Sequence, residues 1–381
     1  YRLMIGLEIL KNRIKDAPQS SGVYLFKNKK DNPIYIGKAI NIKRRLSNYG
    51  NLPKLPRRLQ KMVSQTVNID FELTESERNA LLLEALLIKK FSPRYNIRLK
   101  DDKSFPLIKI TKGDFPRLTR FRNEFSNEDK VFGPFTSALK TDKVIKILQK
   151  SFKLRSCSDL EFKNRKRACL LYDLKQCSAP CVNKVSQNEY KNQVDDTVKF
   201  FQGGQKKIFD KLEKQMVYFS ESQNYEKAAE LRDSIQSLNF IIREEVKIST
   251  QDTNYDYIHI DDKKHFSIYI GFIRYGRYLG GNLIYYSEKF EDDIDLSSLI
   301  IQFYLKNFRP NKIIISKRIN GYNELKSIMR DNYKIDVFLK SSKINGVQKI
   351  SKHTAIRNDK EVNLQKQKFI NNQEILTLMK N

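Results

Sequence analysis

Hydrophobic and polar positions alternate over short stretches near the start of the chain. Residues 22–28 and 33–37 predict two strands joined by a polar turn, and IDFEL at 69–73 predicts a third. Each of the first two strands carries a tyrosine beside a glycine. Residues 1–100 are therefore expected to form one compact α/β unit.

Helical spacing surrounds these strands. We expect helices over about 3–15 and 41–49, the second capped by Asn41. Thr74, followed by Glu77 three residues later, has the spacing of a capping box and predicts the start of a longer, largely apolar helix.

The remaining pattern divides the chain into three further regions: 101–185, 186–245 and 246–381. The last region is expected to be α/β, and its final thirty residues are polar, without a closing element, so it looks incomplete. The expected elements are strands in 105–111 and 130–135, a helix at 140–152, helices through 186–243, strands at 255–260, 265–274, 279–290 and 312–316, and helices at 296–307 and 323–331.

Residues 210–240 predict a helical hairpin. Two amphipathic helices flank the turn SQNY, and about 30 residues cannot bury both apolar faces alone. We therefore expect a helical partner. The alternative is an ordinary hairpin that packs on its own domain.

The net charge indicates a polyanionic partner. Lys and Arg number 72 against 44 Asp and Glu, giving +28 and a pI near 9.7, and such an excess favours nucleic acid. A composition biased toward Lys, Asn and Ile is the alternative cause. No run of 18 apolar residues and no signal-peptide pattern occurs, so we expect a cytoplasmic protein that does not bind membranes. The chain begins with Tyr1 rather than Met and could be a fragment.

All four cysteines lie close together in the sequence. Gaps of eleven, seven and three residues separate Cys157, Cys169, Cys177 and Cys181. Disulfides do not suit a cytoplasmic protein, whereas four thiolates suit Zn²⁺ or an iron–sulfur cluster. The spacing does not distinguish these two metals, and four unrelated buried thiols are the remaining alternative.

Glu84 is the lone charged residue inside the apolar run NALLLEALLI. Its one-turn neighbours, Leu81 and Ile88, are apolar, so Glu84 is expected to be buried. A buried carboxylate needs a metal or a cationic partner. Both alternatives stay open from the sequence: a metal ligand, or a structural partner for Lys or Arg.

The first unit carries groups suited to phosphodiester hydrolysis. Tyr24 and Tyr35 lie on adjacent strands, where nearby cations such as Lys38 and Arg45 could lower the pKa of a phenol that acts as base. Arg45 and Tyr49 share one helix face. The unit contains no His, which argues against a His-based nuclease or a Ser-His triad.

Gly22-Val23-Tyr24 and Tyr35-Ile36-Gly37 resemble the two halves of the signature of GIY-YIG nucleases. The residues that follow in that family's order and approximate spacing are Lys38, Asn41, Arg45, Tyr49, Glu84 and Asn96. The resemblance implies that Glu84 binds a single divalent cation, Mg²⁺ or Mn²⁺, and that Arg45 supports the transition state. It also implies that Tyr24 or Tyr35 is the base. Lys38, Tyr49 and Asn96 are then supporting residues.

Later segments resemble UvrC, a family of nuclease subunits in bacterial nucleotide excision repair. They are LLLEALLIKKFSPRYNIRLKDDKSFPLIKIT, FGPFTSA and CSAPCVNKVSQNEY. For the cysteines, this resemblance implies a 4Fe–4S cluster rather than zinc. The hairpin resembles the UVR motif, through which the family binds UvrB. Its aromatic position is Tyr225, and its core positions are Glu226, Ala229, Arg232 and Asp233.

The resemblance thus implies a multidomain α/β protein: a GIY-YIG nuclease domain, a cysteine-cluster module, a UVR hairpin and an incomplete RNase H-like region. The family usually carries LLLENNLIK around its metal-binding Glu, whereas Ala85 and Leu86 stand here, a loss of polar groups. Neither an Asp-Ile-Ser-His segment nor helix-hairpin-helix motifs are present. The implied activity is incision of damaged double-stranded DNA on the 3′ side of a lesion, without the 5′ incision. The rival hypothesis is a truncated, non-catalytic protein that binds UvrB.

Overall fold

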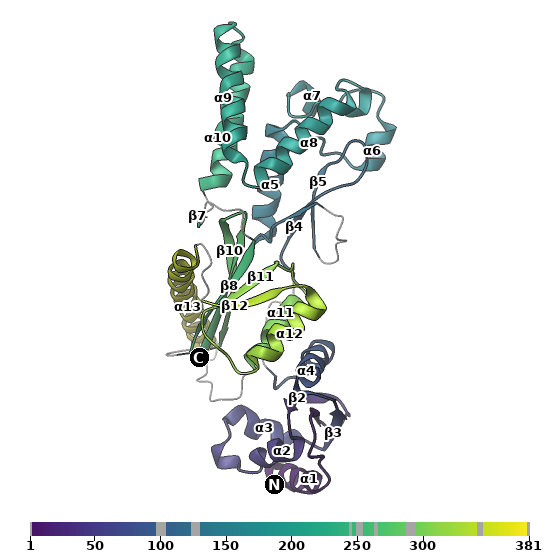
Figure 1. Ribbon diagram of the computed structural model, residues 1–381, viewed down its shortest axis with the longest axis vertical. Coiled ribbons are helices and arrows are strands. Elements are labelled where there is room, and N and C mark those ends of the chain that lie inside the picture. The colour runs from purple at the N-terminus through teal and green to yellow at the C-terminus, as the bar shows by residue number, and fades with distance from the viewer. Residues whose placement is uncertain are drawn as a thin grey trace.

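The computed structural model describes residues 2–96, 104–122, 130–243, 246–248, 254–262, 266–286, 295–340 and 346–378. Figure 1 shows an elongated molecule with the N-terminal unit at one end, a helical hairpin at the other and a larger sheet between them. Within the described ranges, every helix is too short or too polar to cross a bilayer. The expected multidomain α/β architecture is confirmed.

The N-terminal unit is a three-stranded antiparallel sheet in the order β2-β1-β3, covered by helices on both faces. Tyr24 and Phe26 belong to the core shared with α1 to α3, whereas Val23 and Leu25 pack with α4 on the other face. The elements are α1 (Arg2–Lys15), β1 (Gly22–Lys27), β2 (Pro33–Ala39), α2 (Ile42–Tyr49), a 3-10 turn (Leu52–Lys54), α3 (Arg57–Gln65), β3 (Asn68–Leu73) and α4 (Glu77–Phe91).

The two predicted helix caps have different outcomes. Asn41 caps α2 as expected, because its side chain accepts a hydrogen bond from the Arg44 amide at 2.9 Å. The capping box at Thr74 is wrong. Ser76 is the N-cap of α4 and accepts from the Asn79 amide, while the Thr74 hydroxyl donates to the Ser76 carbonyl.

The middle region joins a small sheet, in the order β5-β4-β6, to helices that share one core with the base of the hairpin. The turn of the hairpin exposes Val217, Tyr218 and Tyr225. The elements are β4 (Leu107–Ile110), β5 (Leu118–Phe121), β6 (Val131–Phe132), α5 (Ala138–Ser151), α6 (Asp159–Asn164), α7 (Leu170–Asp173), a 3-10 turn (Pro180–Val182), α8 (Gln187–Phe201), α9 (Gln205–Glu221) and α10 (Tyr225–Arg243).

The C-terminal region forms a six-stranded sheet in the order β12-β11-β8-β9-β10-β7. Strands β8, β9 and β10 are an antiparallel meander, and β11 and β12 add in parallel on the other side of β8. The elements are β7 (Val246–Lys247), β8 (Tyr255–Asp261), β9 (Phe266–Arg274), β10 (Arg277–Tyr286), α11 (Leu296–Tyr304), β11 (Lys312–Ile315), α12 (Tyr322–Tyr333), β12 (Asp336–Leu339) and α13 (Val347–Leu378).

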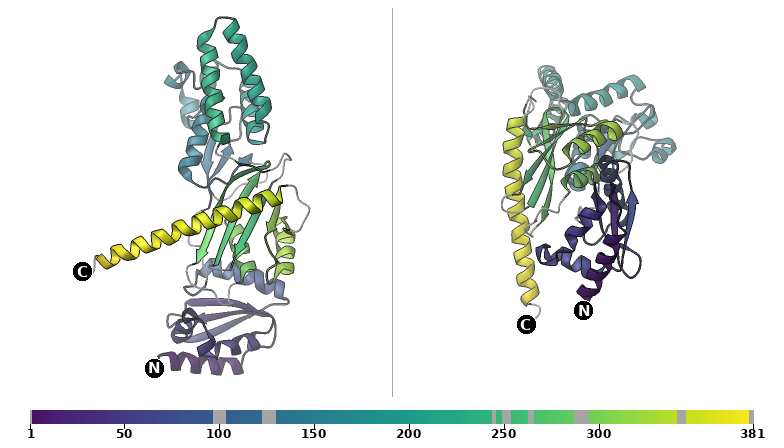
Figure 2. Two further views of the ribbon diagram at one scale, coloured as in Figure 1. Left: turned by 90° about the vertical axis from the view of Figure 1, so that its left-hand side faces the viewer. Right: turned by 60° about the horizontal axis from the view of Figure 1, so that its bottom comes forward.

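Helices lie on both faces of this sheet. Helices α11 and α12 share a core with one face and also contact α4 of the N-terminal unit, whereas α13 packs on β8, β9 and β10. Figure 2 shows α13 crossing the sheet and running past its edge. The expectation that the final residues contain no closing element is wrong over the described part of α13. Its buried positions include Thr354 and Asn358, and these polar residues hide the helical apolar pattern.

Candidate active site

Three tyrosine hydroxyls meet on one side of the N-terminal sheet. Tyr49 lies 2.9 Å from Tyr24 and 3.2 Å from Tyr35, oxygen to oxygen. All three side chains are buried. The Nε of Arg45 lies 3.4 Å from the Tyr24 hydroxyl, and its guanidinium lies over the Tyr49 ring. The structure thus brings together four of the predicted site residues, and Arg45 and Tyr49 share a helix face as expected.

The strand pairing explains why a glycine stands two residues after Tyr35. Tyr24 pairs with Gly37 across β1 and β2, so both lie on the same face as the phenol cluster. A Cβ atom at Gly37 would come within 2.3 Å of the Tyr24 hydroxyl oxygen. Only glycine leaves room for this phenol.

Asn96 fixes the backbone of β2. Its Oδ1 accepts from the Ile36 amide at 2.8 Å, and its Nδ2 donates to the Ile36 carbonyl at 2.6 Å. Because β2 is an edge strand, the Asn96 side chain takes the place of a neighbouring strand. It therefore positions Tyr35 and Gly37 on either side of Ile36.

Glu84 is buried on α4, as predicted, with 5% of its surface exposed. Its Oε1 accepts from the Lys38 backbone amide at 3.1 Å, and its Oε2 has no hydrogen-bond partner among the described residues. Burial raises the pKa of Glu84 to about 8, and the Asp295 carboxylate adds to this rise, while the Lys38 ammonium and the Ser298 hydroxyl oppose it.

The Lys38 ammonium lies among carboxylates. It is 3.2 Å from Glu77 and 3.3 Å from Asp295. Burial alone lowers the pKa of Lys38, but Asp295, Glu84 and Glu77 together outweigh that effect and raise it. Asp295 and Ser298 belong to the start of α11 and were missed by sequence reasoning, since an Asp at a helix N-cap gives no signal beyond the cap itself.

These residues, as arranged, do not fit a bound divalent cation. Glu84 is closed off from water, and the Lys38 ammonium occupies the space among the carboxylates. In the described ranges, no three His, Cys, Asp or Glu side chains are placed to hold one ion. The orphaned Oε2 and the hard oxygen donors nevertheless suit Mg²⁺ or Mn²⁺ in kind.

The four cysteines are free thiols in one module. Burial raises the pKa of Cys177 and Cys181, and Cys157 and Cys169 act in the same direction, so the four lie within electrostatic reach of one another. The Ala179 amide donates to the Cys177 sulfur at 3.4 Å. The absence of a three-ligand group, stated above, covers these residues as well.

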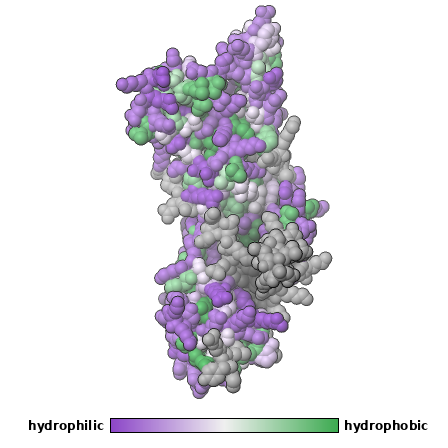
Figure 3. Space-filling view, turned by 180° about the vertical axis from the view of Figure 1, so that it is seen from behind, coloured by the Kyte–Doolittle hydropathy of each residue, from purple (hydrophilic) through white to green (hydrophobic). Residues whose placement is uncertain are grey.

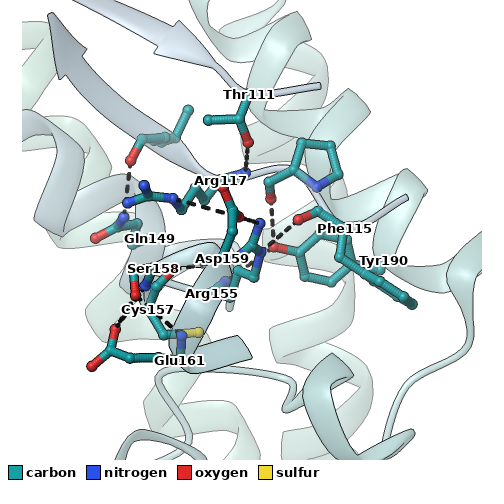
Figure 4. Close-up of polar contacts among 12 residues, drawn as sticks. Thr111, Phe115, Arg117, Gln149, Arg155, Cys157, Ser158, Asp159, Glu161 and Tyr190 are labelled. Atoms are coloured by element: carbon teal, nitrogen blue, oxygen red, sulfur yellow. Dashed lines mark hydrogen bonds and ion pairs between the residues drawn. The ribbon is translucent and has the colours of Figure 1, made fainter. Parts of the chain in front are cut away.

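A buried arginine holds the first cysteine's loop. Figure 4 shows Arg155 reaching the Cys157 carbonyl, at 3.1 Å, and the Asp159 carboxylate, which lies at the start of α6. The Arg155 amide in turn donates to the Tyr190 hydroxyl at 3.1 Å. Arg155 therefore ties the Cys157 loop to α8 and restricts where this thiol can point.

The predicted partner-binding residues line the hairpin. Tyr225, Glu226, Arg232 and Asp233 are exposed, and Ala229 is half-buried. Glu226 pairs with Lys175 of the cysteine module at 3.1 Å. Figure 3, from behind, shows hydrophilic side chains over most of the coloured surface, with hydrophobic ones in small patches.

Three family models match the chain in succession. The UvrC-like GIY-YIG domain matches residues 20–97, the UvrC/Cho excinuclease middle domain matches 105–200, and the UvrB/uvrC motif matches 206–239. The three matches fall in the N-terminal unit, the middle region and the hairpin, and the last of them ends at residue 239.

Two curated relatives match almost the whole of this chain. The chain is 37% identical over 385 residues to the UvrABC system protein C of Rickettsia felis, and 37% identical to that of Rickettsia bellii. Each match covers 98% of this chain and 59% of the relative. Among solved structures, the GIY-YIG N-terminal endonuclease domain of UvrC from Thermotoga maritima, bound to magnesium, is 39% identical, with 23% of this chain and 96% of that chain covered and a TM-score of 0.22.

Proposed function

The chain belongs to the UvrC family, as its succession of matching domains and its curated relatives show, and from this premise we propose that it is a metal-dependent endonuclease of nucleotide excision repair. In this proposal it incises damaged double-stranded DNA on the 3′ side of a lesion, together with UvrB. The observation that carries the proposal is that neighbouring residues of β2 contact both the phenol cluster and Glu84. Gly37 makes room for the Tyr24 phenol, and the next amide, that of Lys38, holds Glu84.

Each residue of the site has its own role in the proposed hydrolysis of the phosphodiester. Tyr24 or Tyr35, in its phenolate form, takes a proton from the attacking water and becomes a neutral phenol. The Tyr49 hydroxyl, which is hydrogen-bonded to both, orients them. Arg45 meets the charge that develops on the phosphate. Asn96 keeps β2 in register, and Glu84 is the residue that would hold Mg²⁺ or Mn²⁺, which supplies charge stabilisation when bound.

In the same proposal, the hairpin around Tyr225 binds UvrB, and the four cysteines hold a 4Fe–4S cluster, with zinc as the alternative. An RNase H-like assignment for residues 246–381 is supported by the three antiparallel strands followed by two parallel ones. Bound iron with a visible absorbance band is expected in the purified protein. A colourless protein containing zinc would contradict the iron–sulfur cluster.

The second candidate function is binding of UvrB without catalysis. It is favoured because α11 and its N-cap Asp295 lie against Glu84 and bury it. An end-labelled duplex with one lesion, incubated with UvrA, UvrB, ATP and Mg²⁺, separates the two. We expect a nick on the 3′ side that requires this chain. Stable binding of UvrB without any nick would favour the second function.

A further inference from the structure

Helix α4 belongs to two hydrophobic cores at once. Ala80, Leu87 and Ile88 pack against the sheet of the N-terminal unit, while Leu81 and Ala85 are fully buried in the core that α11 and α12 share with the large sheet. Glu84 lies between these two faces. The C-terminal α/β domain is therefore docked directly on the helix that carries the proposed metal ligand.

Polar contacts complete this docking around Glu84. At the start of α11, Asp295 pairs with Lys38, with only 15% and 27% of the Lys38 and Asp295 side chains exposed. The Asp295 Oδ1 also caps α11 by accepting from the Ser298 amide at 3.0 Å. A second ion pair across the interface, Arg78 to Asp331 at 2.9 Å, lies farther toward the start of α4 and is more exposed.

The docked arrangement conflicts with cation binding. A Mg²⁺ or Mn²⁺ ion on Glu84 needs five or so further oxygen ligands, mostly water, in a near-octahedral shell. Glu84 is 5% exposed, and α11 and the Lys38 ammonium fill the adjoining space. There is no room for a hydrated cation while Asp295 stays where it is.

We propose that a divalent cation and helix α11 exclude one another at Glu84, so that cation binding releases the C-terminal α/β domain from the nuclease unit. This inference rests on the proposed metal site at Glu84. By linkage, the docked domain weakens cation binding by the same factor by which the cation weakens docking. Nuclease competence is then coupled to the position of a domain that lies outside the nuclease unit.

Hydrogen exchange of the full chain, titrated with Mn²⁺, tests the coupling without measuring incision. We expect Mn²⁺ to raise exchange in residues 77–91 and 296–304, whereas KCl at equal ionic strength leaves it unchanged. Asp295→Asn keeps the helix cap and removes the charge that holds Lys38. It should lower the Mn²⁺ midpoint roughly tenfold, as expected for breaking a partly buried ion pair. Asp331→Asn, which removes the remote exposed pair, should not move the midpoint.

Binding of Mn²⁺, followed by water-proton relaxation, distinguishes the possible failures. Binding that is lost in Glu84→Gln but leaves 296–304 protected would overturn the exclusion and keep the proposed metal site. An exchange response that persists in Glu84→Gln would place the cation elsewhere and overturn it too. If Mn²⁺ does not bind, both the metal site and the exclusion fail. If Asp295→Asn leaves the Mn²⁺ midpoint unchanged, as Asp331→Asn should, the contact of Asp295 with Lys38 does not oppose the cation, and the exclusion is overturned.

Discussion

Glu84→Gln is expected to lower the rate of 3′ incision by roughly 10³-fold, or about 4 kcal/mol of transition-state stabilisation. The substitution keeps the shape of the side chain, and the amide oxygen can still accept from the Lys38 amide. It removes the ionisable carboxyl, whose deprotonated form the divalent cation requires. Because the orphaned Oε2 is the atom left for a cation, its loss acts on the chemistry rather than on the helix.

The measurement is a single-turnover incision assay with UvrA, UvrB, ATP and Mg²⁺ on a lesion-bearing duplex. Glu72→Gln is the matched control, since Glu72 is an exposed carboxylate on β3 of the same unit. It should incise at the unmodified rate. Circular dichroism should show both variants folded. Equal incision by Glu84→Gln and the unmodified chain would remove Glu84 from the mechanism.

Most of the N-terminal unit could be predicted because its signals are local. Alternation located β1 and β2, and Asn41 marked the start of α2. The start of α4 was misplaced because Thr74 and Ser76 are both good caps, and only the backbone geometry selects Ser76. Helix α13 was missed because tertiary contacts, rather than apolar residues alone, bury Thr354 and Asn358.

The phenol cluster was predictable for a similar reason, since strand periodicity places Tyr24 and Tyr35 on one face. The burial of Glu84 by α11 of the C-terminal domain could not be predicted from the sequence. Ala85 suggested a loss of polar groups near a metal, but the structure buries Ala85 completely against the C-terminal domain, where a small residue lets two helices approach closely. Contacts between regions so far apart in sequence leave no periodic signal in either one.

Arg45→Ala is expected to reduce the incision rate by about 10²- to 10³-fold, the usual loss for one preorganised donor that meets transition-state charge. The Arg45 guanidinium is held over the Tyr49 ring and against the Tyr24 hydroxyl, so under the proposed mechanism it is already in place before the phosphate binds. Arg45→Lys should recover only part of the rate, because an ammonium keeps the charge but not the planar set of donors.

Arg44→Ala is the matched control, because Arg44 is the preceding residue of α2 and is exposed to solvent. Losing this cation should weaken DNA binding slightly and reduce its salt dependence, while the rate at saturating substrate stays the same. Arg45→Ala should show the opposite effect to Arg44→Ala, because its kcat should fall while its KM stays nearly constant. If the two variants instead lose affinity alike and keep the same kcat, Arg45 serves only as part of the basic surface, and the phenol cluster must act without a cation at the phosphate.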